Sequence, residues 1–310
     1  MRVATIDIGT NSVLLLIAEH RGPELVPVLE RATITRLGRG VDRTRALDAE
    51  AVAATLACLA EYAAEIQRAG VERVDAVGTS AMRDAQGGEQ FRARAAEILG
   101  CEPRVISGDE EADLTFAGAL AGLSIEGPVV VFDLGGGSTE IIRGRASARG
   151  DTPDRGVSLD IGSVRLTERH LHADPPRADE IAAARRDART ALDGLGTDWL
   201  GDAAGGAARL VGVAGTVTTL AAYALGVAPY DPSRVHGARL DAATIARVAA
   251  DLARVSLAER RALPAIDPKR ADVIVAGATI VEEVLSWSGA AELIVSDRGV
   301  RWGLAKRLAS

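Results

Sequence analysis

Two segments of the chain repeat one order of residue types, and that order is suited to binding an anion. Each segment runs from an apolar strand through a short glycine-containing turn into a second strand, over residues 3–17 and 129–142. The matching positions are Asp7 with Asp133, Gly9 with Gly135, and Ser12 with Ser138. Each segment predicts a β-hairpin with a tight turn, and the pair indicates an internal duplication.

The two turns are predicted phosphate-binding loops. Glycine lets backbone N–H groups approach an anion, and small hydroxyl groups donate to phosphate oxygens. One such hairpin alone would be read as a plain turn, but two in the same phase favour a function. The candidate residues are Gly9, Thr10, Asn11, Ser12, Gly135, Gly136, Gly137, Ser138 and Thr139.

Three carboxylates lie on or beside these apolar strands: Asp7, Asp133 and Glu140. A carboxylate among apolar residues is costly unless it is paired or binds a metal. Magnesium prefers a few carboxylates together with water and substrate phosphates, so the three are candidate metal ligands. The alternative for Asp7 and Glu140 is that each caps a turn or pairs with an arginine.

Further charged groups stand at predicted strand and helix ends. Arg83 follows a strand that ends near Gly78, where a guanidinium could clamp a phosphate; pairing with Asp84 is the alternative. The helix that starts near Ser107 carries four acidic residues, Asp109, Glu110, Glu111 and Asp113. Acidic residues in a first helical turn usually complement the helix dipole, so residue types alone assign none of the four a catalytic role.

A third candidate anion site lies at residues 211–219, where an apolar strand meets Gly215 and Thr216 at a helix start. The same pattern also fits a plain strand-to-helix connection. The chain has no P-loop motif and no nucleophile elbow of the G-x-S-x-G type, so neither of those enzyme classes is indicated.

The elements around these residues alternate between helices and strands, which predicts an α/β protein. We place the boundary between two domains near residue 117: an N-terminal domain over 1–117, a C-terminal domain over 118–299, and a last helix over 300–310 that returns to the first domain. Helices are expected at 48–69, 89–99, 110–120, 178–192, 241–254, 271–287 and 300–308, strands at 71–78, 103–106, 157–161, 210–214 and 293–295, and a glycine-rich loop at 194–206.

Composition narrows the class of protein further. The net charge of −7 argues against a protein that coats nucleic acid or an anionic membrane. Cys58 and Cys101 form no metal-binding pair, and Asp7 interrupts the first apolar stretch, so no disulfide framework or secretory signal is expected. We therefore expect a cytoplasmic protein with no nucleic-acid or membrane partner.

With these motifs in this order, the chain resembles the Ppx/GppA phosphatases of the actin-like superfamily, in their short two-domain form. The markers are residues 6–12, 79–83, 106–112, 132–140, 158–165, 214–216 and 296–301. The resemblance implies two actin-like (ribonuclease H-like) domains with mixed sheets flanked by helices, and an active site in the cleft between them. It also implies a homodimer.

The resemblance assigns roles that residue types alone leave open. Glu111 falls on the family's catalytic glutamate, which would activate the attacking water, and Arg83 falls on a phosphate-binding position. Asp133 and Glu140 fall on metal-associated carboxylates, with Mg²⁺ or Mn²⁺ as the cofactor. The implied reaction removes the terminal phosphate from inorganic polyphosphate or from a guanosine polyphosphate, pppGpp.

Two other functions stay open. An actin-like kinase would pass phosphate between a nucleotide and an acceptor, and would make nucleotide from ADP and polyphosphate. A non-catalytic sensor would bind an alarmone without turnover. Aromatic residues make up 3% of the chain, so stacking on a guanine base is not indicated.

Overall fold

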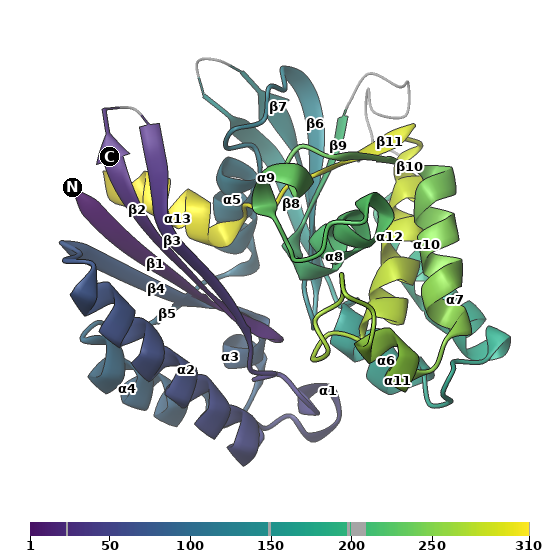
Figure 1. The fold of residues 1–310 in the computed structure, drawn as a ribbon, viewed down its shortest axis with the longest axis horizontal. Helices are drawn as coiled ribbons and strands as arrows, with labels where there is room; N and C mark the ends of the chain where they lie inside the picture. The colour runs from purple at the N-terminus through teal and green to yellow at the C-terminus, as the bar shows by residue number, and fades with distance from the viewer. Residues whose placement is uncertain (23, 148–149, 197–198, 200–208, 310) are drawn as a thin grey trace. The chain divides into compact units, whose positions relative to one another are not determined.

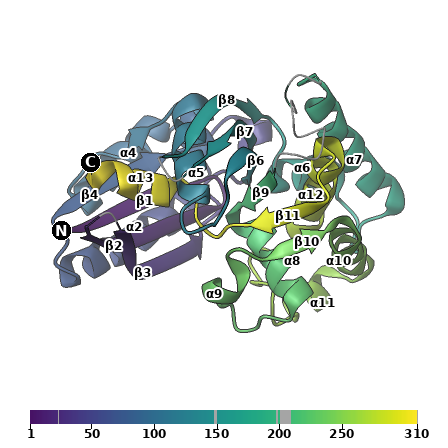
Figure 2. The ribbon, with the colours of Figure 1, turned by 90° about the horizontal axis from the view of Figure 1, so that it is seen from above.

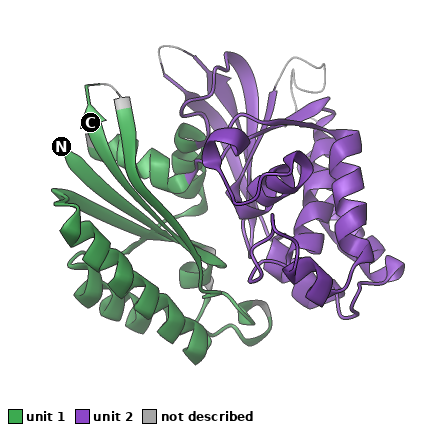
Figure 3. Ribbon diagram, viewed as in Figure 1, with its two compact units in different colours: residues 1–118, 300–310 green, residues 119–299 purple. Residues whose placement is uncertain are grey.

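The computed structural model describes residues 1–310 except 23, 148–149, 197–198, 200–208 and 310 (Figure 1). Residues 1–118 together with 300–310 form one compact unit, unit 1, and residues 119–299 form another, unit 2 (Figure 3). Each unit contains one mixed sheet with helices packed against it, which confirms the predicted α/β class. The glycine-rich loop expected at 194–206 lies mostly outside the described residues.

The sheet of unit 1 has five strands in the order β3-β2-β1-β4-β5 within the described residues. Strand β2 runs antiparallel to both of its neighbours, β1 and β3, whereas β4 and β5 run parallel to β1. The bounds are β1 Arg2–Ile8, β2 Ser12–Arg21, β3 Glu24–Ile34, β4 Arg73–Gly78 and β5 Arg104–Val105. Strands β1, β4 and β5 are parallel neighbours, so their carboxyl ends lie side by side. The segments that follow these three strands therefore start at the same end of the sheet.

Helices cover both faces of the unit 1 sheet. The longest, α2, begins after Asp48, whose carboxylate accepts a 3.0 Å hydrogen bond from the Ala51 N–H, and it ends before Gly70 in the left-handed region. On the other face, α13 packs against β1 and β2 in both ribbon views (Figures 1 and 2). The bounds are α1 Val41–Thr44, α2 Ala49–Arg68, α3 Ser80–Asp84, α4 Gly88–Leu99, α5 Gly108–Ala119 and α13 Val300–Ala309.

Strand β3 is the main element of unit 1 that the sequence pattern does not predict. Among the described strands it pairs only with β2, and it carries Pro27, whose missing N–H is tolerated at a sheet edge. The register shifts between Ile17 and Ala18, where the pairing passes over Val28. Proline and an extra residue within an edge strand together hide the alternation on which strand prediction depends.

The sheet of unit 2 has six strands in the order β10-β11-β9-β6-β7-β8 within the described residues. Strands β6, β7 and β8 form an antiparallel meander, as β1, β2 and β3 do in unit 1. Strands β9 and β11 then run parallel to β6. The bounds are β6 Gly127–Leu134, β7 Thr139–Ala146, β8 Thr152–Leu159, β9 Arg209–Val213, β10 Arg239–Asp241 and β11 Glu292–Val295.

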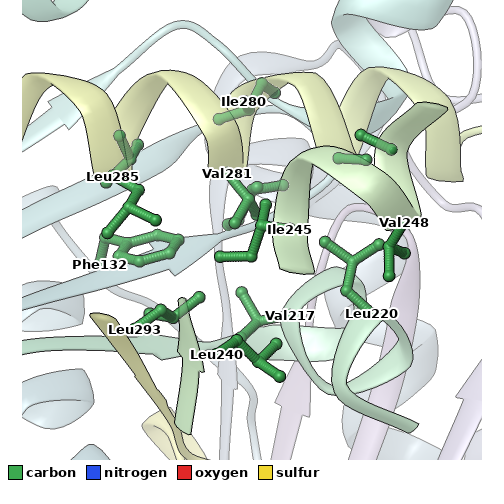
Figure 4. Close-up of a cluster of buried hydrophobic side chains, with 14 of the residues drawn as sticks. Phe132, Val217, Leu220, Leu240, Ile245, Val248, Ile280, Val281, Leu285 and Leu293 are labelled. Carbon is green, nitrogen blue, oxygen red and sulfur yellow. The ribbon is translucent and has the colours of Figure 1, made fainter. Parts of the chain in front are cut away.

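The core of unit 2 forms between its sheet and a layer of helices centred on α12, which packs against α6, α7, α8 and α10. Figure 4 shows Phe132 of β6 beneath Leu285 of α12, with Val217 and Ile245 filling the neighbouring space. Helix α12 begins three residues later than expected, after a turn closed by the Val273 N–H and the Arg270 carbonyl at 3.1 Å. The bounds are α6 Ser163–His170, α7 Ala178–Asp193, α8 Ala214–Leu225, α9 Pro232–Val235, α10 Ala242–Arg254, α11 Leu257–Arg261 and α12 Ile274–Ser288.

Candidate active site

The two predicted turns have the same internal geometry. We call residues 9–12 the first elbow and residues 135–138 the second elbow. The Gly9 N–H donates to the Ser12 carbonyl at 3.0 Å, and the Gly135 N–H donates to the Ser138 carbonyl at 3.0 Å. The duplication seen in the sequence is therefore a duplication of backbone conformation.

In the second elbow, the start of α6 binds the loop carbonyl groups. The Gly135 carbonyl accepts from the Ser163 N–H at 3.0 Å, and the Gly136 carbonyl accepts from the Val164 N–H at 2.9 Å. In a planar trans peptide, the next residue's N–H points away from the carbonyl. The N–H groups of Gly136 and Gly137 therefore point away from α6. They have no acceptor in the part of the chain that the structure describes, so they can receive an anion.

The first elbow is held in the same way by the segment that follows β3. The Thr10 carbonyl accepts from the Gly38 N–H at 2.8 Å, and the Asn11 carbonyl accepts from the N–H groups of Thr35 and Arg36 at 3.1 and 3.0 Å. Arg36 has φ 59, an uncommon value for a residue other than glycine. The same argument then points the Asn11 N–H away from these donors.

The hydroxyl groups of the second elbow differ in their availability. The Thr139 hydroxyl donates to the buried Ile161 carbonyl at 2.7 Å, so its proton is engaged inside unit 2. Ser138 is buried, and its hydroxyl has no partner among the described residues. Of these two predicted donors, Ser138 is the one whose side chain can serve a phosphate.

The predicted metal ligands lie in different surroundings. Asp133 on β6 stands directly opposite Glu140 on β7, so both side chains lie on one face of the sheet. Glu140 is buried and accepts a 2.8 Å hydrogen bond from the Ser158 hydroxyl. In unit 1, Asp7 stands opposite Leu14, so the duplicated hairpin has no second carboxylate there.

This donor set fits a hard divalent ion that keeps much of its water. The described residues contain no cluster of three or more potential metal-ligating His, Cys, Asp or Glu side chains. Magnesium is commonly bound through one or two carboxylates, with water and substrate oxygens completing the shell. The pair Asp133 and Glu140 meets that requirement. Asp7, the third predicted ligand, belongs to unit 1, and its role as a ligand stays a prediction.

Arg83 and Glu111 lie together at the carboxyl ends of the parallel strands of the unit 1 sheet. Strands β1, β4 and β5 end side by side, and the first elbow, α3 and α5 follow them. The Arg83 guanidinium donates to the Ile106 carbonyl at 3.1 Å and lies 3.4 Å from the Glu111 carboxylate. The alternative prediction is an ion pair between Arg83 and Asp84. The Asp84 side chain lies outside the described part of the structure, so that ion pair stays a prediction.

Burial distinguishes Glu111 from the other acidic residues of α5. Glu111 is 6% exposed, whereas Asp109 and Asp113 lie at the surface. Glu110 binds Arg104 at 3.0 Å and Arg307 at 2.9 Å. Burial alone would raise the pKa of Glu110, but these two arginines lower that pKa overall. Glu110 is therefore held as a charged partner, and Glu111 is the buried carboxylate beside an arginine.

The start of α8 contributes a second set of N–H groups in unit 2. No side chain caps this helix, and Ala214 at its first position has φ 75, a strained value for alanine. Strained backbone and an uncapped helix start are both common where a site binds a ligand. Gly215 and Thr216 lie in this first turn, and Thr216 is buried.

Sequence reasoning missed Arg270, which lies against this helix start. A β-carbon on Gly215 would overlap the Arg270 guanidinium. Burial lowers the pKa of Arg270, yet a guanidinium stays protonated at neutral pH. Asp267 attracts this guanidinium electrostatically, but no described residue forms an ion pair with it. The cation and the helix start together favour a negative ligand, and no local sequence pattern connects Arg270 with Gly215.

These features define a phosphate-handling α/β protein built from two related units. The chain belongs to the Ppx/GppA phosphatase family, whose family model matches residues 16–309. Phosphatases of this family depend on divalent metal ions.

Individual relatives span the full chain. It is 42% identical to exopolyphosphatase 2 of Mycobacterium tuberculosis, over 99% of this chain and 98% of that protein. The crystal structure of the Aquifex aeolicus family member matches with a TM-score of 0.82 at 36% identity, over 100% of this chain and 97% of that one. The structure of an exopolyphosphatase from Cytophaga hutchinsonii matches with a TM-score of 0.89 at 25% identity, over 99% and 97% of the two chains.

Among the described residues, no helix combines the length and the apolar character needed to cross a lipid bilayer.

Proposed function

We propose that this protein hydrolyses the terminal phosphoanhydride bond of inorganic polyphosphate, with pppGpp as the second substrate. The observation that carries the proposal is the duplicated elbow. In each elbow the carbonyl groups accept hydrogen bonds from the protein, so the N–H groups on the opposite side of the same peptides can bind a phosphate. The likeness to an exopolyphosphatase over the full chain supports polyphosphate as the substrate. Polyphosphate has no base to stack, and aromatic residues make up 3% of this chain.

Glu111 is the proposed general base. It accepts a proton from water as the water attacks the terminal phosphorus, and the P–O bond to the rest of the chain breaks in line with the attack. Arg83 lies beside the Glu111 carboxylate, and its positive charge stabilises the phosphate oxygens. The elbow N–H groups, the Ser138 hydroxyl and Arg270 stabilise the negative charge that spreads over the phosphoryl oxygens.

Asp133 and Glu140 would hold a divalent ion, with Mg²⁺ or Mn²⁺ as the candidates. That ion would supply positive charge to neutralise the phosphate oxygens. The homodimer and the cytoplasmic location expected from the sequence stay predictions.

The test compares Glu111→Gln with Glu110→Gln. The two carboxylates are neighbours in the first turn of α5, but Glu110 is bound by Arg104 and Arg307. Phosphate release from polyphosphate and from pppGpp is measured with Mg²⁺. We expect Glu111→Gln to lower kcat by about two to four decades, the scale of general-base effects, and Glu110→Gln to change it by less than about threefold.

Equal losses in the two variants would refute the assignment of the base. Nucleotide formation from ADP and polyphosphate in excess of free phosphate would instead identify a kinase. Tight binding of pppGpp with no turnover by the wild-type protein would identify a sensor.

A further inference from the structure

Arg165 of α6 makes a side-chain contact with the second elbow that the sequence does not suggest. Its Nε donates to the Gly137 carbonyl at 2.6 Å, and its side chain is 11% exposed. The same guanidinium lies 3.5 Å from the Asp160 carboxylate, which is 86% exposed. An exposed ion pair of that length contributes little, so the contact with the elbow is the stronger of these two.

The contact completes a series of three. The carbonyl groups of Gly135 and Gly136 accept from backbone N–H groups at the start of α6. The Gly137 carbonyl, the next one along, accepts from the Arg165 side chain. Because the carbonyl and the following N–H of a trans peptide point in opposite directions, Arg165 aims the Ser138 N–H to the same side as those of Gly136 and Gly137.

The first elbow achieves the same result with backbone alone. Asn11 occupies the position of Gly137 in the duplication, and its carbonyl accepts from the N–H groups of Thr35 and Arg36. In unit 2 a side chain replaces those two donors. The hydrogen bond from Arg165 matters because glycine has the greatest conformational freedom of any residue type. The backbone of Gly135, Gly136 and Gly137 itself therefore offers little resistance to rotation of the peptide between Gly137 and Ser138.

We propose that Arg165 is a positioning residue that holds the peptide between Gly137 and Ser138 with its N–H toward the phosphate. This inference rests on the proposed function of the elbows. Without Arg165, the peptide can rotate and turn the Gly137 carbonyl toward the anion, where the two oxygens repel each other. In this role Arg165 acts through the peptide that it holds, not through its own contact with the substrate.

The test uses Arg165→Ala with Arg169→Ala as the matched control. Arg169 lies one turn further along α6 and pairs with Asp187 at 3.3 Å. We expect Arg165→Ala to lower kcat/KM for polyphosphate by about 10- to 100-fold, below the full effect of deleting an oxyanion donor. Arg169→Ala should stay within about twofold of the wild type. Added guanidinium ion should restore part of the lost activity, whereas the Arg165→Lys variant should not recover it, because an ammonium group lacks the Nε donor geometry.

A binding measurement separates this inference from the proposed function. Calorimetry with methylenediphosphonate, which cannot be hydrolysed at its bridge, should show about 10-fold weaker binding to Arg165→Ala than to the wild type. Wild-type turnover and binding in Arg165→Ala would overturn the positioning role, as would a loss of activity that guanidinium does not restore. A wild-type protein that binds the diphosphonate but releases no phosphate would instead refute the proposed hydrolase, while the comparison of binding would still test Arg165.

Discussion

Substituting Gly162 with alanine tests whether the position of the second elbow controls activity. Gly162 precedes α6 with φ −152 and ψ 161, an extended conformation that alanine adopts without strain. An added β-carbon would overlap the Gly136 carbonyl and lie 2.6 Å from the Gly137 carbonyl carbon. The effect of Gly162→Ala is therefore steric and is directed at the elbow.

The size of the effect follows from the overlap. Relief to an ordinary van der Waals contact requires the elbow or the start of α6 to move by roughly 1 Å, because neighbouring backbone atoms cannot be compressed. A displacement of about 1 Å in a site that positions a reacting group can lower the rate by about 100-fold. Overpacking of this kind lowers the free energy of unfolding by about 1–3 kcal/mol, which a unit with so large a core tolerates.

The assay measures kcat/KM for phosphate release together with thermal unfolding. Gly194→Ala is the matched control: Gly194 has φ −61, and a β-carbon there would meet its nearest neighbours at 3.4 and 3.5 Å. The control should leave kcat/KM within about twofold of the wild type. If Gly162→Ala kept kcat/KM within about threefold of the wild type, activity would not depend on holding the second elbow in this position.

Three further predictions concern the metal, the pH dependence of stability and the core. EDTA should abolish phosphate release, and Asp133→Asn should raise the Mg²⁺ concentration for half-maximal activity at least about 10-fold, as metal titrations would show. Burial raises the pKa of Tyr62 above its ordinary value of 10.0. The folded state therefore keeps this proton longer than the unfolded state, so stability is full below pH 10 and falls above it by about 1.4 kcal/mol per pH unit. Tyr62→Phe should lack this part of the slope in denaturant titrations at alkaline pH, and an identical slope would contradict the assignment. Leu304 is 0% exposed and packs with Val77 and Leu114, so Leu304→Ala should lower the free energy of unfolding by about 2–5 kcal/mol in urea titrations.

Local chemistry explains which parts of the fold could be predicted. Helix α2 is predicted to within one residue because Asp48 caps its start and Gly70 ends it. The start of α5 near Ser107 is also predicted, and the Ser107 hydroxyl accepts a 3.1 Å hydrogen bond from the Glu110 N–H there. Strand β3 is not predicted, because Pro27 and an extra residue disturb its alternation at a sheet edge.

The candidate site could be predicted as far as its residues are close in sequence. Both elbows follow from their Asp, Gly and Ser spacing, and their backbone hydrogen bonds agree with that pattern. Arg270 has no sequence relation to Gly215, so only tertiary structure brings them together. The hydrogen bond from the Thr139 hydroxyl to the Ile161 carbonyl likewise depends on tertiary structure, and the spacing of residues in the sequence does not predict it.

The assembly of unit 1 from two separate stretches has a consequence for biosynthesis. Helix α13 completes this unit through a small apolar cluster that includes Val77, Leu114, Val300 and Leu304, and a β-carbon on Gly303 would overlap the Leu114 backbone. The ribosome makes α13 only after all of residues 119–299. Until α13 has been synthesised, the sheet of unit 1 therefore has one apolar face uncovered. Unit 2, which is complete earlier, can fold before unit 1 does. A nascent chain stalled before residue 300 would expose that face, and chaperones or proteases would act on it there rather than on the inserted unit.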